Sequence, residues 1–542
     1  MHLVNDVRII QLWNTYKVLG KLKYINLSHS QNLVRTPDFS GTPNLERLVL
    51  EECTSLVEIN FSVGDLGRLV LLNLKNCRNL KTLPESIRLE KLEIFILSGC
   101  LKLKSFPEIE GKMNCLAELY LGATALSELP ASIENLSGVG VINLSYCKRL
   151  ESLPRSISRL KCLKTLDVSG CSKLKKLPDD LGLLIGLEEL HCTDTAIRTI
   201  PSSVSLLKNL KHLSLRKCNA LGLQGSSSSF FPWLQEKSHG QKFMGINFHN
   251  LSGLCSLTNL DLSDCNISNG GILCNLGFLL SLVELNLDGN NFPNIPAASI
   301  SSLTRLKVLA LAGCRRLEIF PELPPSIEKL YADECTSLKS IDQLTKYPML
   351  RTVSLRKCHQ LLKDKRHASI LDSLWKHMLK ELSMMGGRFS IYAPGVEIPE
   401  WFTHKNSGAS ISVALPKNWY THDFMGFAIC AGFDMKTPFI LSCVNYLQTF
   451  QGLGMRCQFT CHDGSFSEVS SSFGLIGSEN HLDLGHTFLG YLSFDSLWWA
   501  FEHMVYSPNN WIQFEFGASN ENPVIKGLGV RLVYKNDIND PE

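Results

Sequence analysis

The 542-residue sequence contains no run of eighteen consecutive apolar residues, and this absence argues against a membrane-spanning helix. Residues 1–6 lack the basic stretch and the following apolar run of a secretory signal, so we expect none there. No G-x-x-x-x-G-K-[ST] sequence occurs, which excludes a phosphate loop of that type. The net charge is only +3, and Lys and Arg are scattered among acids, so we expect no nucleic-acid partner.

Aromatic residues are scarce in the first part of the chain. Residues 1–386 hold 20 of the 46 aromatic residues, and residues 387–542 hold the other 26. The formal charge changes at the same place, from +10 before residue 387 to −7 after it. A break in composition and charge of this kind marks a second domain.

A repeat of about 24 residues runs through the first two-thirds of the chain, with the pattern L-x-x-L-x-L-x-x-C-x-x-L. Self-similarity at this period is typical of a leucine-rich-repeat solenoid, an α/β horseshoe with a parallel β-sheet. One step, from Leu210 to Leu257, has double length and holds either a degenerate repeat or an insertion. The first Leu-like positions are Leu22, Leu45, Leu69, Leu92, Leu116, Val139, Leu163, Leu187, Leu210, Leu257, Leu282, Leu306, Ile327 and Leu350.

The L-x-L centre of each repeat predicts a short strand whose leucines point inward. The residues that flank these leucines should then face solvent on the concave side of the sheet, which is the usual binding surface of a solenoid. Tyr and Arg are favoured there because they supply contact area and directional donors. The nine positions that we predict for ligand contact are Glu51, Lys75, Tyr120, Tyr146, His191, Arg216, Lys217, Asp261 and Tyr331.

Most of the nineteen cysteines stand at one repeat position, three residues after the second leucine of the pair. Cysteine at this frequency without a secretory signal indicates a reducing compartment. We interpret these residues as buried thiols in the turn that leaves the strand rather than as metal ligands or disulfides. Thr124 and Thr195 replace the cysteine in two repeats, and a thiolate metal site would not tolerate that exchange.

The pattern changes after the repeats. Between Asp364 and Met385 the apolar residues follow a helical period and end at Gly386-Gly387, which predicts a capping helix or linker over residues 363–386. Short aromatic or β-branched segments follow and predict an all-β sandwich, jelly-roll or Ig-like, over residues 387–536 with a tail at 537–542. The solenoid is expected over residues 1–362, with about 14 to 15 repeats and an insertion near residues 222–253.

Several segments resemble a known family. The first repeats carry Leu27-Ser28-His29-Ser30-Gln31-Asn32-Leu33 and Thr36-Pro37-Asp38-Phe39-Ser40-Gly41. The later part carries Pro394-Gly395-Val396-Glu397-Ile398-Pro399-Glu400-Trp401-Phe402, Leu415-Pro416-Lys417-Asn418-Trp419-Tyr420 and Gly529-Val530-Arg531-Leu532-Val533-Tyr534. Together they resemble the leucine-rich repeats and the post-LRR domain, called C-JID, of plant TIR-type intracellular immune receptors.

This resemblance implies a protein-recognition module that acts in defence in the cytoplasm, with the nucleus left open as a second compartment. Its ligand would be a pathogen effector or a guarded host protein, and TIR or NB-ARC domains could act with it in trans. The NAD-hydrolysing TIR domain and the nucleotide-binding NB-ARC domain of that family are not part of this sequence. We therefore expect no enzymatic activity, no cofactor and no metal.

Two other classes of function stay open. One is an extracellular leucine-rich-repeat binding protein, which disulfides or a glycan at Asn143 would favour. The other is an enzyme hidden in the C-terminal β domain, where Cys457, Cys461 and His462 could form half of a zinc site but lack a second ligand pair at matching spacing. His503 and Cys443 have no identifiable nucleophile partner, and the carboxylate pairs Glu51-Glu52 and Glu188-Glu189 are expected on solvated strand ends.

Overall fold

The computed structural model describes residues 2–4, 13, 17–218, 251–268, 273, 276–364, 366–383, 388–395, 397–435, 453–461, 466–473, 483–493, 511–518 and 524–539. The chain forms two compact units, unit 1 (Met1–Asn290) and unit 2 (Asn291–Glu542). The described residues of unit 1 form repeats, whereas those of unit 2 form repeats and the predicted β domain.

Unit 1 contains a parallel sheet of three-residue strands. The strands on its inner side are β1 (His2–Val4), β2 (Tyr24–Asn26), β3 (Arg47–Val49), β4 (Leu71–Asn73), β6 (Ile94–Ile96), β8 (Glu118–Tyr120), β9 (Val141–Asn143), β10 (Thr165–Asp167), β11 (Glu189–His191), β12 (His212–Ser214), β13 (Asn259–Asp261) and β14 (Glu284–Asn286). The middle residue of each strand from β2 to β14 is buried, and neighbouring middle residues pair in register, as Leu48 does with Leu72. The predicted solenoid is confirmed.

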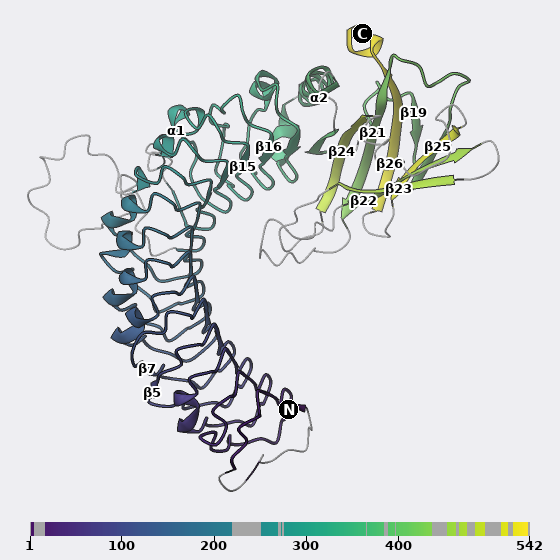
Figure 1. Ribbon diagram of the computed structural model, residues 1–542. Helices are drawn as coiled ribbons and strands as arrows, with labels where there is room; N and C mark the ends of the chain where they lie inside the picture. The colour runs from purple at the N-terminus through teal and green to yellow at the C-terminus, as the bar shows by residue number, and fades with distance from the viewer. Residues whose placement is uncertain are drawn as a thin grey trace, which may run out of the picture. The chain divides into compact units, whose positions relative to one another are not determined.

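Short helices occupy the outer side of unit 1, opposite the strands (Figure 1). They are η1 (Phe61–Asp65), η2 (Ala131–Asn135), η3 (Arg155–Arg159), η4 (Leu181–Leu183) and η5 (Ser202–Leu206), and a two-stranded sheet joins β5 (Ser86–Ile87) to β7 (Glu108–Ile109). Pro130, Pro154 and Pro201, each preceded by Leu or Ile, occupy the N-caps of η2, η3 and η5. Proline suits these positions because its fixed φ fits the entry to a helix and its missing N–H costs no hydrogen bond there.

The double-length step lies between two adjacent strands. β12 pairs directly with β13, with His212 opposite Asn259 and Ser214 opposite Asp261. The residues between β12 and β13 therefore contribute no strand between these two strands of the sheet. Of the insertion predicted near residues 222–253, residues 222–250 lie outside the described residues.

Unit 2 begins with three repeat strands, β15 (Val308–Ala310), β16 (Lys329–Tyr331) and β17 (Thr352–Ser354), and the helical turns α1 (Ala297–Ser301), η9 (Asp342–Lys346) and η10 (His359–Lys363). β17 pairs in parallel with β18 (Arg388–Pro394), so that the first strand of the β domain continues the repeat sheet. The last repeat strand thereby finds hydrogen-bond partners for an edge that would otherwise be open.

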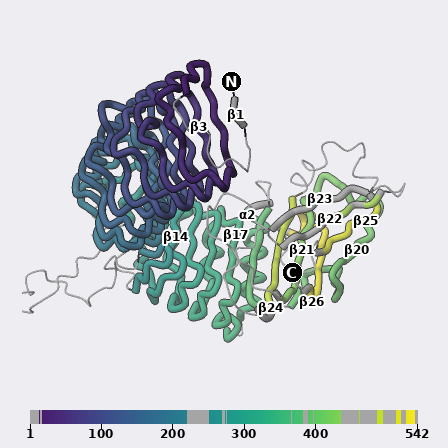
Figure 2. The backbone as a smooth tube through the Cα atoms, turned by 90° about the horizontal axis from the view of Figure 1, so that it is seen from below, coloured from purple at the N-terminus to yellow at the C-terminus, as the bar shows by residue number. Residues whose placement is uncertain are grey.

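The rest of unit 2 is a two-sheet sandwich. One sheet runs from β18 through β24 (Asp483–Ser493), β21 (Phe424–Met435) and β26 (Val524–Tyr534) to β19 (His404–Asn406), and β24, β21 and β26 lie side by side in Figure 2. The other sheet has the order β20 (Ser410–Ala414), β25 (Trp511–Ala518), β22 (Leu453–Cys461) and β23 (Phe466–Phe473). One buried cluster joins the two sheets through Phe427, Phe488, Phe514 and Phe516, which confirms the predicted sandwich.

The predicted helix is α2 (His367–Ser383), which contacts η9, η10, β18 and β24. Leu374, Trp375, Met378 and Leu379 on its apolar face are buried. The Trp375 ring lies 4.8 Å from the ring of Phe389 and 5.7 Å from that of Trp401. The end of the repeats is therefore covered by α2 and by β18 together. The short helix α4 (Asn536–Asn539) follows β26 near the C-terminus.

Candidate protein-binding face

The solvent side of the parallel sheet is formed by the first and third residue of each strand and by the residue two positions after the strand. Tyr120, His191, Asp261 and Tyr331 are the third residues of β8, β11, β13 and β16. Glu51, Lys75 and Arg216 stand two positions after β3, β4 and β12, and Tyr146 and Lys217 stand three positions after β9 and β12. All of them are partly or fully exposed, and Tyr331 alone belongs to unit 2.

The predicted residues form separate small groups in unit 1. The Nζ of Lys75 lies 3.1 Å from a carboxylate oxygen of Glu51, while the hydroxyl of Tyr120 donates to Glu118 at 2.9 Å. The Nε2 of His191 is 3.4 Å from Glu189. Most of the nine predicted residues therefore contact a neighbour on their own repeat or the next one, and the face is a row of local sites.

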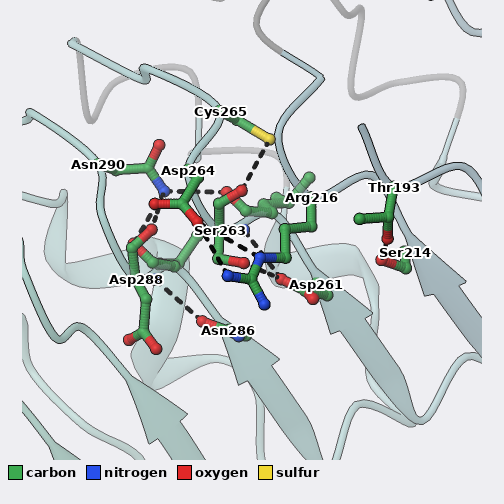
Figure 3. A network of polar contacts seen from close by, with 12 residues as sticks. Thr193, Ser214, Arg216, Asp261, Ser263, Asp264, Cys265, Asn286, Asp288 and Asn290 are labelled. Carbon is green, nitrogen blue, oxygen red and sulfur yellow. Dashed lines mark hydrogen bonds and ion pairs between the residues drawn. The ribbon is translucent and has the colours of Figure 1, made fainter. Parts of the chain in front are cut away.

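Arg216 and Asp261 belong to one polar network at the ends of β12 and β13 (Figure 3). Arg216 donates from Nε to Asp264 at 3.3 Å, and Asp261 accepts from the backbone N–H and the hydroxyl of Ser263 at 2.9 and 2.6 Å. Burial raises the pKa of Asp261, while the Ser263 hydrogen bonds and the Arg216 charge act against that rise. Asp261 thus has a structural role in addition to any contact with a ligand.

The same turn recurs along the sheet. Asn26, Asn73, Asn143, Asp167, Asp261 and Asn286 each accept the backbone N–H two residues later. Such Asx turns satisfy the backbone where a strand ends. We missed this role from the sequence, although Asn26-x-Ser28, Asn143-x-Ser145 and Asp261-x-Ser263 were visible signals.

The residue before each cysteine position adopts a left-handed backbone. Tyr146 has φ 59° and Lys217 has φ 58°, and Gly99, Gly170 and Gly289 occupy the same place in other repeats. The Tyr146 side chain lies over Gly170 in the turn of the next repeat. A Cβ added to Gly170 would stand only 2.6 Å from Cδ1 of Tyr146, so this position leaves no room for a side chain. Tyr146 therefore covers the edge of the next repeat and keeps 56% of its surface exposed.

The repeat cysteines are buried free thiols, as predicted. Each donates to a carbonyl about one repeat earlier, as Cys53 does to Leu27 at 3.0 Å and Cys171 to Leu144 at 3.2 Å. Thr124 and Thr195 take the same place and contact the thiols of Cys147 and Cys218, both at 3.2 Å. A neutral hydroxyl can replace a neutral donor thiol, which explains the exchange.

Timed alkylation of the native chain should separate two kinds of thiol. Burial raises the pKa of Cys53 to about 11 and of Cys265 to about 12. We expect N-ethylmaleimide at pH 8 to modify the exposed Cys115, Cys162 and Cys255 at least about a hundredfold faster than these, because only an accessible thiolate reacts. Mass spectrometry of the digested protein gives the rates, and the denatured chain is the control. Equal rates at Cys171 and Cys162 would contradict the buried thiols.

A buried ion pair lies beside Tyr331 in unit 2. Asp333 accepts from the Arg356 guanidinium at 2.6 Å, from the Arg356 backbone at 2.8 Å and from the Ser354 hydroxyl at 2.6 Å. A second ion pair joins the residues that follow these two in the chain, with Lys357 Nζ 3.0 Å from a carboxylate oxygen of Glu334. The sequence analysis did not identify these residues. The acidic partners, Asp333 and Glu334, lie in one repeat and the basic partners, Arg356 and Lys357, lie in the next, so no single repeat contains a complete pair.

Carboxylates considered for acid–base chemistry contact Lys or His side chains. Glu51 pairs with Lys75, Glu52 lies 3.0 Å from His29, and Glu188 lies between Lys164 and Lys211. The part of the chain that the structure describes holds no group of three or more His, Cys, Asp or Glu residues fit for a metal. Cys457 and Cys461 are residues of β22, whereas His462, Cys443 and His503 lie outside the described residues.

Comparison with known proteins places both parts of the chain. Residues 393–539 match the C-JID domain model, and residues 88–177 match the model for the leucine-rich repeats of RPS4B-like disease resistance proteins. TMV resistance protein N of Nicotiana glutinosa is 33% identical over 435 residues, which cover 77% of this chain and 35% of that protein. The chain carries the leucine-rich repeats and the C-JID domain of plant disease-resistance proteins. The resemblance drawn from the sequence is thus confirmed for the regions that the chain contains.

Other disease-resistance proteins match over a larger share of the chain. Disease resistance-like protein DSC1 of Arabidopsis thaliana is 32% identical, and the match covers 89% of this chain and 39% of DSC1. Disease resistance protein RPS4B of the same species is 26% identical, and the match covers 98% of this chain and 38% of RPS4B. The chain thus spans between a third and two-fifths of the length of these relatives. Among solved structures, the LRR protein LIC12759 of Leptospira interrogans is similar at 22% sequence identity and a TM-score of 0.42. The match covers 62% of this chain and 79% of the LIC12759 chain.

None of the described helices has the length and apolar character needed to cross a membrane.

Proposed function

We propose that this chain is the non-catalytic recognition module of a plant immune receptor. The repeats of residues 1–362 bind a pathogen effector, or a host protein guarded against one, through the solvent side of the parallel sheet. The β domain of residues 387–536 provides a second contact region for the same ligand. TIR and NB-ARC domains, in cis or in trans, convert binding into a defence signal in the cytoplasm, with the nucleus as a further compartment.

One observation supports this proposal most directly: buried repeat positions are uniform, and solvent positions differ from strand to strand. The middle residues of β8, β10 and β11 are all leucine, whereas their third residues are Tyr120, Asp167 and His191. A rigid backbone with variable side chains suits specific recognition, because little conformational entropy is lost on binding. The disease-resistance relatives support the same assignment.

The absence of catalysis is also part of the proposal. Many polar groups of the concave face are engaged in ion pairs, Asx turns or hydrogen bonds within a strand, as Glu118 is with Tyr120. A general base or nucleophile would need a titratable group directed at a substrate. Free buried thiols favour an intracellular chain over the extracellular alternative, because oxidising compartments form disulfides.

Direct binding tests this function. The purified full chain is titrated by calorimetry against a panel of individually purified pathogen effector proteins. We expect at least one effector to bind, and Tyr120→Ala, His191→Ala or Arg216→Ala to weaken that binding about tenfold or more, as the loss of a central contact does. The matched control is Leu183→Ser on the outer side of unit 1, where the leucine is 54% exposed.

Circular dichroism of each variant confirms that the fold is retained. An effector whose binding is unchanged in all three concave variants but lost in the Leu183 variant would place recognition on the outer side and contradict the proposal. Turnover of a small-molecule substrate by the chain would contradict its non-catalytic part.

A further inference from the structure

Strand β6 has an unusual solvent side. Ile94 and Ile96, its first and third residues, are both aliphatic and partly exposed. Among the described strands from β2 to β14, it is the only one with aliphatic residues at both of these positions, and β10 to β14 have polar residues at all of them. The feature is specific to this part of the face.

Neighbouring strands extend the apolar surface. Leu71 on β4 stands opposite Ile94, and Val49 on β3 shares the row of Ile96, with Asn73 between them. Adjacent parallel strands are about 4.8 Å apart, so these side chains can be covered by one ligand group. We call Val49, Leu71, Ile94 and Ile96 the aliphatic patch. All four are partly exposed.

Polar groups surround the aliphatic patch. On the side of the strand ends, Lys75 pairs with Glu51, which also accepts from Asn73 at 3.2 Å. On the side of β8, Tyr120 stands opposite Ile96 and donates to Glu118, which stands opposite Ile94. An apolar centre inside a polar rim is the usual anatomy of a protein-binding hot spot, because the rim excludes water from the centre.

Two acidic residues near the patch lie on its β8 side, and the basic residues lie on the opposite side. Glu93 precedes β6 and Glu118 lies on β8, and neither forms an ion pair with another described residue. Two cations lie near the patch: Lys75, which pairs with Glu51, and Arg47, which stands opposite Leu71 on the side away from β8. A ligand group that pairs with Glu93 and Glu118 would therefore be positive and would lie toward β8.

We propose that the aliphatic patch anchors the protein ligand by binding an aliphatic or aromatic side chain, while Glu93 and Glu118 pair with a Lys or Arg next to it. The inference rests on the proposed function and adds the chemistry of the ligand: an apolar residue close to a basic one on the ligand's surface. The sequence analysis selected polar and aromatic residues and so passed over Ile94 and Ile96.

A peptide library tests this chemistry and does not require an identified effector. Random twelve-residue peptides displayed on phage are selected on the immobilised full chain. Enriched peptides are then synthesised, and their binding is measured by fluorescence anisotropy. We expect enriched sequences to combine an aliphatic or aromatic residue with Lys or Arg. We expect Ile94→Thr with Ile96→Thr to weaken binding at least about tenfold, because threonine keeps the β-branch but loses apolar contact.

The matched control is Val308→Thr, the same kind of change at the first position of β15 in unit 2, and it should leave binding unchanged. Glu93→Gln with Glu118→Gln should weaken binding about threefold to tenfold, and the difference should shrink at 0.5 M salt. Enriched peptides without a basic residue, equal affinity for the isoleucine double variant, or no enrichment would each overturn the proposal.

Self-association through the patch would also overturn it. In that case the molar mass from light scattering would exceed the monomer and fall on the Ile94→Thr, Ile96→Thr change. The proposed function is judged separately: an effector that binds through Tyr120 or His191 but tolerates the isoleucine double variant would leave that function intact and remove only the anchor.

Discussion

The variant Arg356→Met is expected to lose about 3 to 5 kcal/mol of unfolding free energy, the cost of leaving one partner of a buried ion pair alone. The Arg356 and Asp333 side chains are only 11% and 8% exposed, and their closest contact is 2.6 Å. Asp333 would keep the Ser354 hydroxyl and one backbone N–H but lose its counter-charge. Urea unfolding followed by circular dichroism measures the change.

Two further variants control this experiment. Lys339→Met breaks the pair with Glu318, where the side chains are 57% and 49% exposed, and it should change the unfolding free energy by less than about 1 kcal/mol. Asp333→Asn combined with Arg356→Met should recover part of the loss, because no buried charge remains unpaired. A single variant as stable as the Lys339 control would show that Asp333 is solvated and that the buried pair is absent.

The repeat architecture follows from the sequence because its cause is local and periodic. Leu48, Leu72 and Leu119 occupy the same position in their repeats, each is buried, and each pairs in register with the middle residue of a neighbouring strand. Periodicity also explained the cysteines, whose replacement by Thr124 and Thr195 indicated a neutral buried donor. The helix α2 was equally visible, since its apolar residues follow a period of 3.6 and a glycine pair follows it in the sequence.

Contacts between distant segments could not be predicted in the same way. The pairing of β17 with β18 joins Val353 to Ile391, and the pairing of β18 with β24 joins Ile391 to Leu489. No periodic signal connects these segments, because partner choice depends on the packing of the whole domain. The sequence therefore predicted a separate β domain but did not show that its first strand extends the repeat sheet.

The sequence predicted which positions are exposed on or beside the sheet, while ligand contact at those positions stays a prediction. All nine predicted positions are at least partly exposed on or beside the strands. Asp261 and Arg216, however, serve a network of turns, and the sequence alone does not separate a side chain that holds a turn from one that is available to a ligand. The aliphatic residues of β6 were overlooked because an isoleucine in a strand is ordinarily assigned to the core.

The variant Trp375→Ala should have an effect as large as that of Arg356→Met, about 3 to 5 kcal/mol of unfolding free energy. Trp375 is 2% exposed, and its ring lies 4.8 Å from Phe389, 5.7 Å from Trp401 and 6.0 Å from Phe402. These three residues belong to β18 or follow it, so the indole connects α2 to the β domain. Removing it leaves a cavity at that connection.

Hydrogen–deuterium exchange locates the damage, and we expect faster exchange in α2, β18 and β24 with no change in β2 to β8 of unit 1. Trp375→Phe should cost much less, because the indole N–H has no hydrogen-bond partner and only volume is lost. Phe278→Ala, which removes a ring that is 58% exposed, should stay within about 0.5 kcal/mol. If Trp375→Ala lost no more unfolding free energy than Phe278→Ala, the contacts of α2 would not stabilise the connection between the β domain and the last repeats. The pairing of β17 with β18 would then be the main connection.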